Sequence, residues 1–304
     1  MNNLVLSITW DVNPRIFETE YISPAWYGLL FALALMASYR VVSKFFKLEG
    51  QSEEQLDKLA WYTILGTVIG ARLGHVFFYG PLRNVEFNGQ VIRTGYLDNP
   101  IDILKIWEGG LASHGAAIAI LISLYLYYRF SGINKPYLWI VDRIAVVSAL
   151  GGTFVRIGNL INSEIVGKPT ELPWGFHFVR NYDYGDVPRH PTQLYEALCY
   201  IVIFFVLYRI YKNFKGQTPN GLLLGLFLTL TFTARFCIEF LKEVQVDSEY
   251  DLLAEMGLNM GQILSIPLVL IGLGLSFWAY SKRKLVQIQN DEPQIEPPAA
   301  DQDA

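Results

Sequence analysis

The sequence is poor in charge. Only 17% of its 304 residues are Asp, Glu, Lys or Arg, whereas about 25% is usual for soluble proteins. Hydrophobic residues make up 52% of the chain and the mean hydropathy is +0.28. This scarcity excludes an ordinary soluble globular domain. The formal net charge of −4 also gives no reason to expect a nucleic-acid partner, which would favour a basic surface.

Cysteine and histidine are scarce as well, with two and four residues. Cys199 and Cys237 both fall in apolar runs, so no disulfide framework and no paired metal motif is visible. We interpret them as small apolar packing residues and expect neither metal nor cofactor. The first twenty residues lack a basic region followed by an apolar run and a cleavage site, so no cleaved signal peptide is predicted.

Long apolar runs are abundant. Seven approach or reach the roughly 20 residues needed to cross a bilayer. They lie at about 24–43, 61–79, 112–130, 137–155, 195–213, 221–241 and 260–280. The sequence therefore predicts an all-α polytopic membrane protein with seven transmembrane helices in a single domain over residues 1–284. The acidic, proline-containing stretch 285–304 is expected to be a disordered tail.

Short basic loops alternate with longer loops of mixed charge. The basic loops lie near residues 40–47, 129–135, 209–215 and 282–284. The positive-inside rule places these loops in the cytoplasm, which puts the N-terminus outside and the C-terminus with its tail in the cytoplasm. The longer loops 81–106 and 165–189 are expected to form small outer caps, with turn signals at Asn88-Gly89 and Asn99-Pro100.

Polar residues gather where the fourth apolar run ends, between Gly151 and Gly167. Arg156 and Asn159 are three residues apart and share one face if the helix continues that far. A guanidinium offers five donors in a planar fork that suits phosphate or carboxylate. The alternative is a helix end with a snorkelling arginine and ordinary turn residues. The density of amides, glycines and Glu164 around Arg156 favours a site for a polar headgroup.

Two histidines stand at the starts of apolar runs. His114 opens the third run, and a histidine that titrates near pH 6.5 can take a proton from a nucleophile. A capping or hydrogen-bonded structural histidine is the alternative. His190-Pro191 opens the fifth run, where proline suits the first helical position. His190 and Glu196 would hold the mouth of a site, or they belong to a plain helix start.

Charged pairs occur near the ends of two other runs. Arg235 and Glu239 are four residues apart in the sixth run, so they face the same way. They form either a structural buried ion pair or, with Arg156, a two-arginine clamp on an anionic headgroup. Asp142 and Arg143 are interpreted as a structural pair at the membrane interface.

Seven motifs, in order over residues 24–280, resemble those of the prolipoprotein diacylglyceryl transferase family. They are Trp26-Tyr27-Gly28, Gly70-Ala71-Arg72, Glu108 to Gly115, Gly152 to Gly167, Arg189 to Glu196, Arg235 to Phe240 and Met260 to Ser265. The fourth and fifth are the most specific. The chain departs from the family pattern at Ala116, where a glycine is expected, and at Thr231, where some members have tyrosine. The stretch after Glu243 lacks the family's proline-aspartate ending.

The resemblance implies an enzyme that transfers the diacylglyceryl group of phosphatidylglycerol to the lipobox cysteine of a prolipoprotein signal peptide. The products would be a thioether and glycerol phosphate, made at the outer leaflet of the bacterial plasma (inner) membrane. No cofactor is implied. A secondary transporter would instead carry polar groups near the midplane and an internal repeat, and no repeat is found. A lipid-binding scaffold would need the arginines but not His114.

A thiol reacts as the thiolate, so His114 is the candidate base. Arg156 and Arg235 would hold the phosphate and stabilise its growing charge, with a further hydrogen bond from Asn159. Glu164 and Glu239 would orient the arginines or bind headgroup hydroxyls. The remaining expected substrate-binding residues are Tyr27, Gly167 and His190; the first two are carried over from the family.

Overall fold

The structure is a computed structural model. It describes residues 7–20, 22–82, 85–87, 90–93, 95–105, 110, 112–181, 187–244 and 256–291. The predicted Asn88-Gly89 turn, the Glu108-Gly109 part of the histidine motif and the predicted tail beyond residue 291 lie outside the described residues.

Long α-helices make up most of the described residues. They are α1 (Trp26–Leu48), α2 (Glu53–Phe78), α3 (Ser113–Phe130), α4 (Tyr137–Ile161), α5 (Thr192–Asn213), α6 (Leu222–Glu239) and α8 (Met260–Asp291). Each overlaps one predicted apolar run, so the prediction of a mostly helical chain is confirmed. Helix α4 continues past the predicted boundary at residue 155 and therefore carries Arg156 and Asn159. Helix α8 continues to Asp291, into the segment predicted to be a tail.

Five of these helices are long and apolar enough to cross a membrane: α1, α4, α5, α6 and the Met260–Arg283 part of α8. Helices α2 and α3 are less apolar because they contain Arg72 and His75, and His114 and Arg129, respectively. The fold is thus consistent with a polytopic membrane protein.

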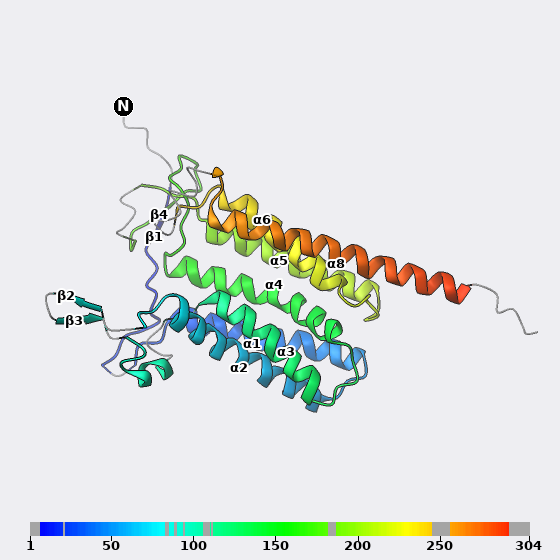
Figure 1. The fold of residues 1–304 in the computed structure, drawn as a ribbon. Coiled ribbons are helices and arrows are strands. Elements are labelled where there is room, and N and C mark those ends of the chain that lie inside the picture. Colours follow the sequence, from blue (N-terminus) through cyan, green and yellow to red (C-terminus); the bar gives the residue numbers. More distant parts are fainter. Residues whose placement is uncertain are drawn as a thin grey trace, which may run out of the picture.

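The helices run alternately in opposite directions, with α4 at the centre of the bundle (Figure 1). Helix α4 contacts α1, α3, α5 and α6, while α2 packs on α3 and α6 packs on α8. The starts of α1, α3, α5 and α8 therefore meet the ends of α2, α4 and α6 at one end of the bundle. We call this the strand end, because the short β-strands lie there, and the other the opposite end.

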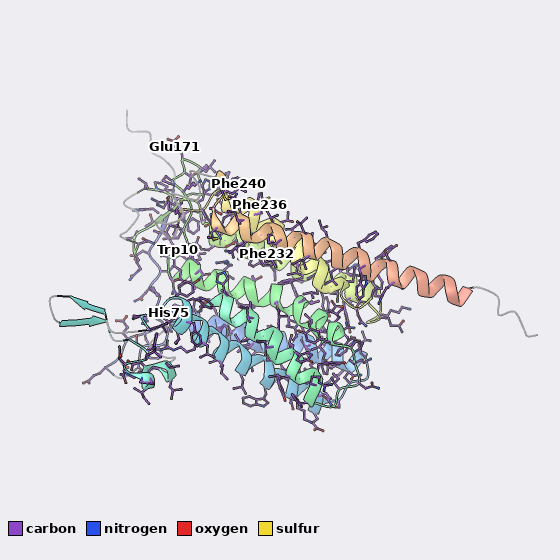
Figure 2. All side chains as sticks on the ribbon, viewed as in Figure 1. Trp10, His75, Glu171, Phe232, Phe236 and Phe240 are labelled. Atoms are coloured by element: carbon purple, nitrogen blue, oxygen red, sulfur yellow. The ribbon has the colours of Figure 1, made fainter. Side chains whose placement is uncertain are left out.

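Short strands cover the strand end. Strand β1 (Ile8–Trp10) pairs in parallel with β4 (Phe176–Phe178), while β2 (Val85–Phe87) pairs antiparallel with β3 (Gln90–Arg93). A 3-10 helix, η1 (Pro100–Leu104), follows the second pair. The Trp10 indole N–H donates to the Leu160 carbonyl over 2.9 Å and ties β1 to the last turn of α4. Trp10 and His75 both lie at this end (Figure 2). Both predicted cap segments thus contain regular structure.

Close helix packing and a buried arginine shape the α2–α3 pair. A methyl group at Gly74 would lie only 2.7 Å from the Gly115 Cα, so glycine is needed for these backbones to approach. Arg72 is 5% exposed and donates to the carbonyls of Ile103 (2.9 Å) and Gly110 (3.2 Å). Arg72 therefore ties α2 to η1 and to Gly110.

Asp142 and Arg143 are structural, as predicted, but each has its principal partners elsewhere. Arg143 pairs with Glu49 at 2.8 Å, whereas Arg143 Nη1 is 4.0 Å from the Asp142 carboxylate. Asp142 accepts the backbone N–H groups of Gly221 and Leu224, each over 2.8 Å. It thereby caps the start of α6 from a neighbouring helix, because these N–H groups have no partner within α6.

Candidate active site

A buried ion pair joins the last turns of α4 to the first turns of α5. Arg156 Nε lies 2.8 Å from Glu196 Oε2, and the two side chains are 12% and 0% exposed. A fully buried carboxylate requires a cationic or hydrogen-bonding partner. The charge of the arginine predicted to bind a headgroup is therefore compensated within the protein by Glu196.

Lys242 extends this pair into a chain of alternating charge. Its ammonium is 3.0 Å from Glu196 Oε1 and 3.0 Å from Glu239 Oε2, and its side chain is 3% exposed. We call Arg156, Glu196, Lys242 and Glu239 the ion chain. The alternative of a structural Arg235–Glu239 pair is wrong: α6 ends at Glu239, and the turn that follows brings Lys242 back to that carboxylate.

Arg235, the second arginine of the predicted clamp, does not belong to the ion chain. It is half-buried, and within the described part of the chain it makes no ion pair or hydrogen bond. The buried Tyr200 lies within electrostatic reach of both Arg156 and Arg235. The structure thus brings the two arginines of the predicted clamp toward the same residue, while the guanidinium of Arg235 stays available.

Arg156 is also linked to Asn159 and, through it, to Glu164. Arg156 Nη1 donates to Asn159 Oδ1 over 3.2 Å, which confirms the predicted shared helix face. Asn159 Nδ2 donates to Glu164 Oε1 over 2.7 Å, and Asn162 donates to the same oxygen over 3.3 Å. Glu164 therefore acts on Arg156 through an amide rather than by a direct ion pair.

The turn that carries Glu164 is strained. Ser163 and Ile165 have positive φ angles of 55° and 58°, a conformation that costs non-glycine residues of order 1–3 kcal/mol each. The start of α5 holds the turn: Gln193 donates to the Glu164 carbonyl over 2.6 Å and Thr192 to that of Ile165 over 3.0 Å. Such strain is concentrated at functional sites, and no pattern in the sequence indicated it.

Tyr27 lies against the same turn of α4. A methyl group at Gly158 would be 2.6 Å from Tyr27 Cδ2, so the ring rests directly on the glycine backbone. The Tyr27 hydroxyl is within electrostatic reach of Glu164 and Arg156. The glycine expected to allow a close approach therefore admits Tyr27, which borders the ion chain.

Gly167 has a packing role beside the site. Its N–H donates to the His190 carbonyl over 2.9 Å, and it bridges to Lys242 in an antiparallel backbone pair. A methyl group there would lie 2.6 Å from the His190 carbonyl oxygen and 2.8 Å from that of Leu241. Only glycine allows these backbone segments to meet, and their meeting fixes where Lys242 enters the ion chain.

His190 lies at the rim of the site. Its Nδ1 is 3.2 Å from the Tyr195 hydroxyl oxygen, which in turn accepts the Trp174 indole N–H over 3.0 Å. The hydroxyl of Tyr195 can donate to Nδ1 or accept from it, according to the tautomer of the ring. Partial burial also lowers the pKa of His190.

Gly261 is a site residue that the sequence did not reveal. A methyl group there would lie 2.5 Å from the Glu239 carboxylate, so this glycine of α8 makes room for the end of the ion chain. Two polar side chains beside it bond locally. Gln262 Oε1 accepts the Asn259 N–H over 3.0 Å and Ser265 donates to the Gly261 carbonyl over 2.6 Å, both within the start of α8.

His114 stands apart from the ion chain. It lies in the first turn of α3 at the strand end and is exposed. Among the described residues it makes no hydrogen bond to Arg156, Glu196, Lys242 or Glu239. Its part in catalysis therefore stays a prediction.

An apolar cavity of about 310 Å³ lies between α1, α2, α3 and α4. Its lining includes Phe31, Leu35, Leu59, Ile64, Val147 and Val155. Its lining reaches Val155 in α4, one residue before Arg156, although none of the ion-chain residues lines it. Its apolar lining suits a hydrocarbon chain.

A helical membrane protein with a buried polar site at one end of its bundle is the class that the fold and site define. A family model for prolipoprotein diacylglyceryl transferase matches residues 14–278. The chain belongs to this family, so the resemblance predicted from the motifs is confirmed.

Several similar proteins are named phosphatidylglycerol–prolipoprotein diacylglyceryl transferase. One from Porphyromonas gingivalis is 44% identical over 276 residues, which is 88% of this chain and 93% of that protein. One from Tolumonas auensis is 44% identical over 266 residues, or 88% and 95%. One from Bacteroides fragilis is 43% identical over 288 residues, or 94% and 100%.

Proposed function

We propose that this protein transfers the diacylglyceryl group of phosphatidylglycerol to the thiol of a lipobox cysteine in a prolipoprotein. This transfer is the first step of bacterial lipoprotein maturation. Family membership and the names of the similar proteins support it. The observation that carries the chemistry is the guanidinium of Arg156, paired with Glu196, together with that of Arg235, which has no partner in the described part of the chain and acts electrostatically on the same Tyr200 as Arg156.

Arg156 and Arg235 bind the phosphate of phosphatidylglycerol. A planar guanidinium gives two parallel donors to phosphate oxygens. The ion pair with Glu196 and the hydrogen bond to Asn159 keep Arg156 in the site before the substrate arrives. Donors that are already in place stabilise charge that develops in the transition state.

The thiolate attacks the glycerol carbon that bears the phosphate. A carbon–sulfur bond forms, the carbon–oxygen bond to phosphate breaks, and the electron pair leaves with glycerol phosphate. His114 accepts the thiol proton, directly or through a relay. The two arginines offset the negative charge on the leaving phosphate. The nucleophile belongs to the substrate, so neither Cys199 nor Cys237 takes part.

Other site residues position these groups. Asn159 links Arg156 to Glu164, and Glu239 acts on the site through Lys242. Tyr27 and Glu164 border the place where the headgroup glycerol would lie. The apolar cavity beside Val155 accommodates an acyl chain. Gly167 and His190 form the packed rim.

The reaction takes place at the outer leaflet of the bacterial plasma (inner) membrane. Seven crossings, an outer N-terminus and a cytoplasmic C-terminus follow from the alternation of basic and mixed loops. The strand end, where the ion chain lies, then faces outward, and the prolipoprotein cysteine approaches from that side.

The test is direct. The purified protein is incubated in micelles that contain phosphatidylglycerol and a lipobox peptide, and the peptide is weighed by mass spectrometry. We expect a gain of one diacylglyceryl group on the cysteine. An unmodified peptide, with folded protein and both substrates present, would overturn the proposed transferase activity. Lipid binding without product would indicate a scaffold, and lipid movement across vesicles would indicate a transporter.

A further inference from the structure

A second polar region lies at the opposite end of the bundle, where the α5–α6 turn meets α8. Two adjoining hollows of about 470 and 390 Å³ lie there, and Gln217 and Arg283 line both. Lys282 and Asn220 line the first hollow, and Lys215 lines the second. Among the residues that the structure describes, no carboxylate lines either one. We call the pair of hollows the basic hollow.

Aromatic rings, rather than carboxylates, hold two of its cations. The Arg283 guanidinium carbon is 4.4 Å from the centroid of the Phe214 ring, and the Lys282 ammonium is 4.5 Å from that of Trp278. Within the part of the chain that the structure describes, neither they nor Lys215 form an ion pair. A cation on an aromatic face is positioned but keeps its full charge. The basic hollow therefore presents net positive charge in a concave site.

Buried side chains of α4 anchor the turn beside the basic hollow. The buried Arg143 donates to the Gly216 carbonyl over 3.0 Å, and Asp142 accepts the Gly221 N–H over 2.8 Å. Lys215, which directly precedes Gly216, has a left-handed conformation with φ of 50°. Because buried side chains of α4 fix both ends of the turn, the hollow exists before a ligand arrives, which reduces the ordering cost of binding.

We propose that the basic hollow binds the phosphate group of an anionic phospholipid, at the end of the bundle opposite to the ion chain. Arginine and lysine are the side chains that recognise phosphate, and basic pockets between transmembrane helices bind anionic headgroups. A lipid source is favoured over free phosphate because the apolar face of α8 continues from the hollow: Phe277 is 75% and Trp278 41% exposed. The bound lipid joins α8 to the α5–α6 turn.

The site is tested by native mass spectrometry of the full-length protein in detergent, titrated with phosphatidylserine or phosphatidylcholine. Phosphatidylserine is used because it is anionic without being the proposed donor lipid. Removal of each charge should weaken phosphatidylserine binding about fivefold, so Lys282→Gln/Arg283→Gln should weaken it about 25-fold. Phosphatidylcholine binding should not change.

The matched control is Arg40→Gln/Lys44→Gln. It removes two exposed cations from the last turns of α1, which lie at the same end of the bundle as the hollow but do not line it. It should bind phosphatidylserine like the unmodified protein. Equal loss in both double variants would indicate diffuse surface charge and overturn the site, as would unchanged binding in Lys282→Gln/Arg283→Gln. Arg283→Lys should recover most of the binding, which separates charge from misfolding. Displacement of the lipid by millimolar inorganic phosphate would overturn the lipid assignment in favour of a free anion.

Discussion

Helix α4 carries a buried arginine near each end, and the two are used differently. At the opposite end, Arg143 is 1% exposed on its side chain and pairs with Glu49 at 2.8 Å. It also donates to the carbonyls of Trp139 (3.4 Å) and Gly216 (3.0 Å). Glu49 in turn accepts hydrogen bonds from Trp139 over 2.6 Å and Tyr211 over 2.7 Å. This cluster is complete without a ligand.

At the strand end, Arg156 also pairs with a glutamate at 2.8 Å, but its surroundings are not closed. Glu196 is shared with Lys242, and the nearby Arg235 makes no ion pair with the described residues. Arg143, whose donors have partners within the protein, holds helices together. Arg156 belongs to a cluster that also contains Arg235, unpaired in the described part of the chain, and such a cluster can bind an anion. Whether an arginine has a complete set of partners therefore distinguishes a structural role from a functional one better than its charge or its burial does.

The largest effect on stability is expected at the opposite end. Arg143→Met should leave the buried Glu49 carboxylate uncompensated and lower the free energy of unfolding by about 3–5 kcal/mol. Thermal unfolding in detergent measures this, with Lys44→Met as the exposed control. An unchanged melting temperature would show that the closed cluster does not support the fold.

His114→Gln tests whether the catalytic site extends beyond the ion chain. Loss of a general base typically costs about 10²–10⁴ in rate, so most transfer at neutral pH should be lost. Because His114 is exposed, the melting temperature and phosphatidylglycerol binding should stay the same. Unchanged turnover would remove His114 as the base and confine the chemistry to the ion chain.

Lys242 distinguishes a positioned arginine from a merely buried one. Lys242→Met removes the cation that Glu196 and Glu239 share, and Arg156 should lose its orientation. Hydrogen bonds to charged groups contribute about 1.5–3 kcal/mol, so kcat/KM should fall roughly 10- to 150-fold. Lys242→Arg keeps the charge and should recover most of the activity. A lower melting temperature with normal kcat and KM in the folded fraction would assign Lys242 a structural role only.

His190 should give the smallest effect. Burial lowers its pKa below the usual value near 6.5, so the folded state favours the neutral ring. Stability is therefore full above pH 6.5 and falls as the pH drops from there toward the folded-state pKa. His190→Asn should flatten this decline, by no more than about 2 °C in melting temperature between pH 7 and 5. Parallel profiles for the two proteins would show that His190 does not titrate in this way.

Much of the fold was accessible from the sequence because hydrophobic run length is a strong signal for membrane helices. The Arg156–Asn159 contact was also predictable, because helical spacing places residues three apart on one face. Asp142 and Arg143 show the limit of this reasoning. Neighbours in sequence point in different directions on a helix, so each found its principal partner on another element.

The ion chain itself was not predictable. Lys242 follows the end of α6, and a lysine at such a position is expected to lie at the membrane interface and to extend its ammonium to water. Its burial depends on the turn after Glu239 and on the backbone contact with Gly167, which join segments far apart in sequence. The same holds for Gly261, whose absent side chain matters only because the Glu239 carboxylate lies there.

One measurement tests the contrast between the two arginines most directly: transfer to the lipobox peptide by Arg156→Ala, read by mass spectrometry beside its melting temperature. Because Lys242 still neutralises Glu196 in this variant, we expect it to stay folded, with a melting temperature near that of the unmodified protein. The peptide should gain no diacylglyceryl group. Near-normal transfer by folded Arg156→Ala would contradict a phosphate-binding role for Arg156.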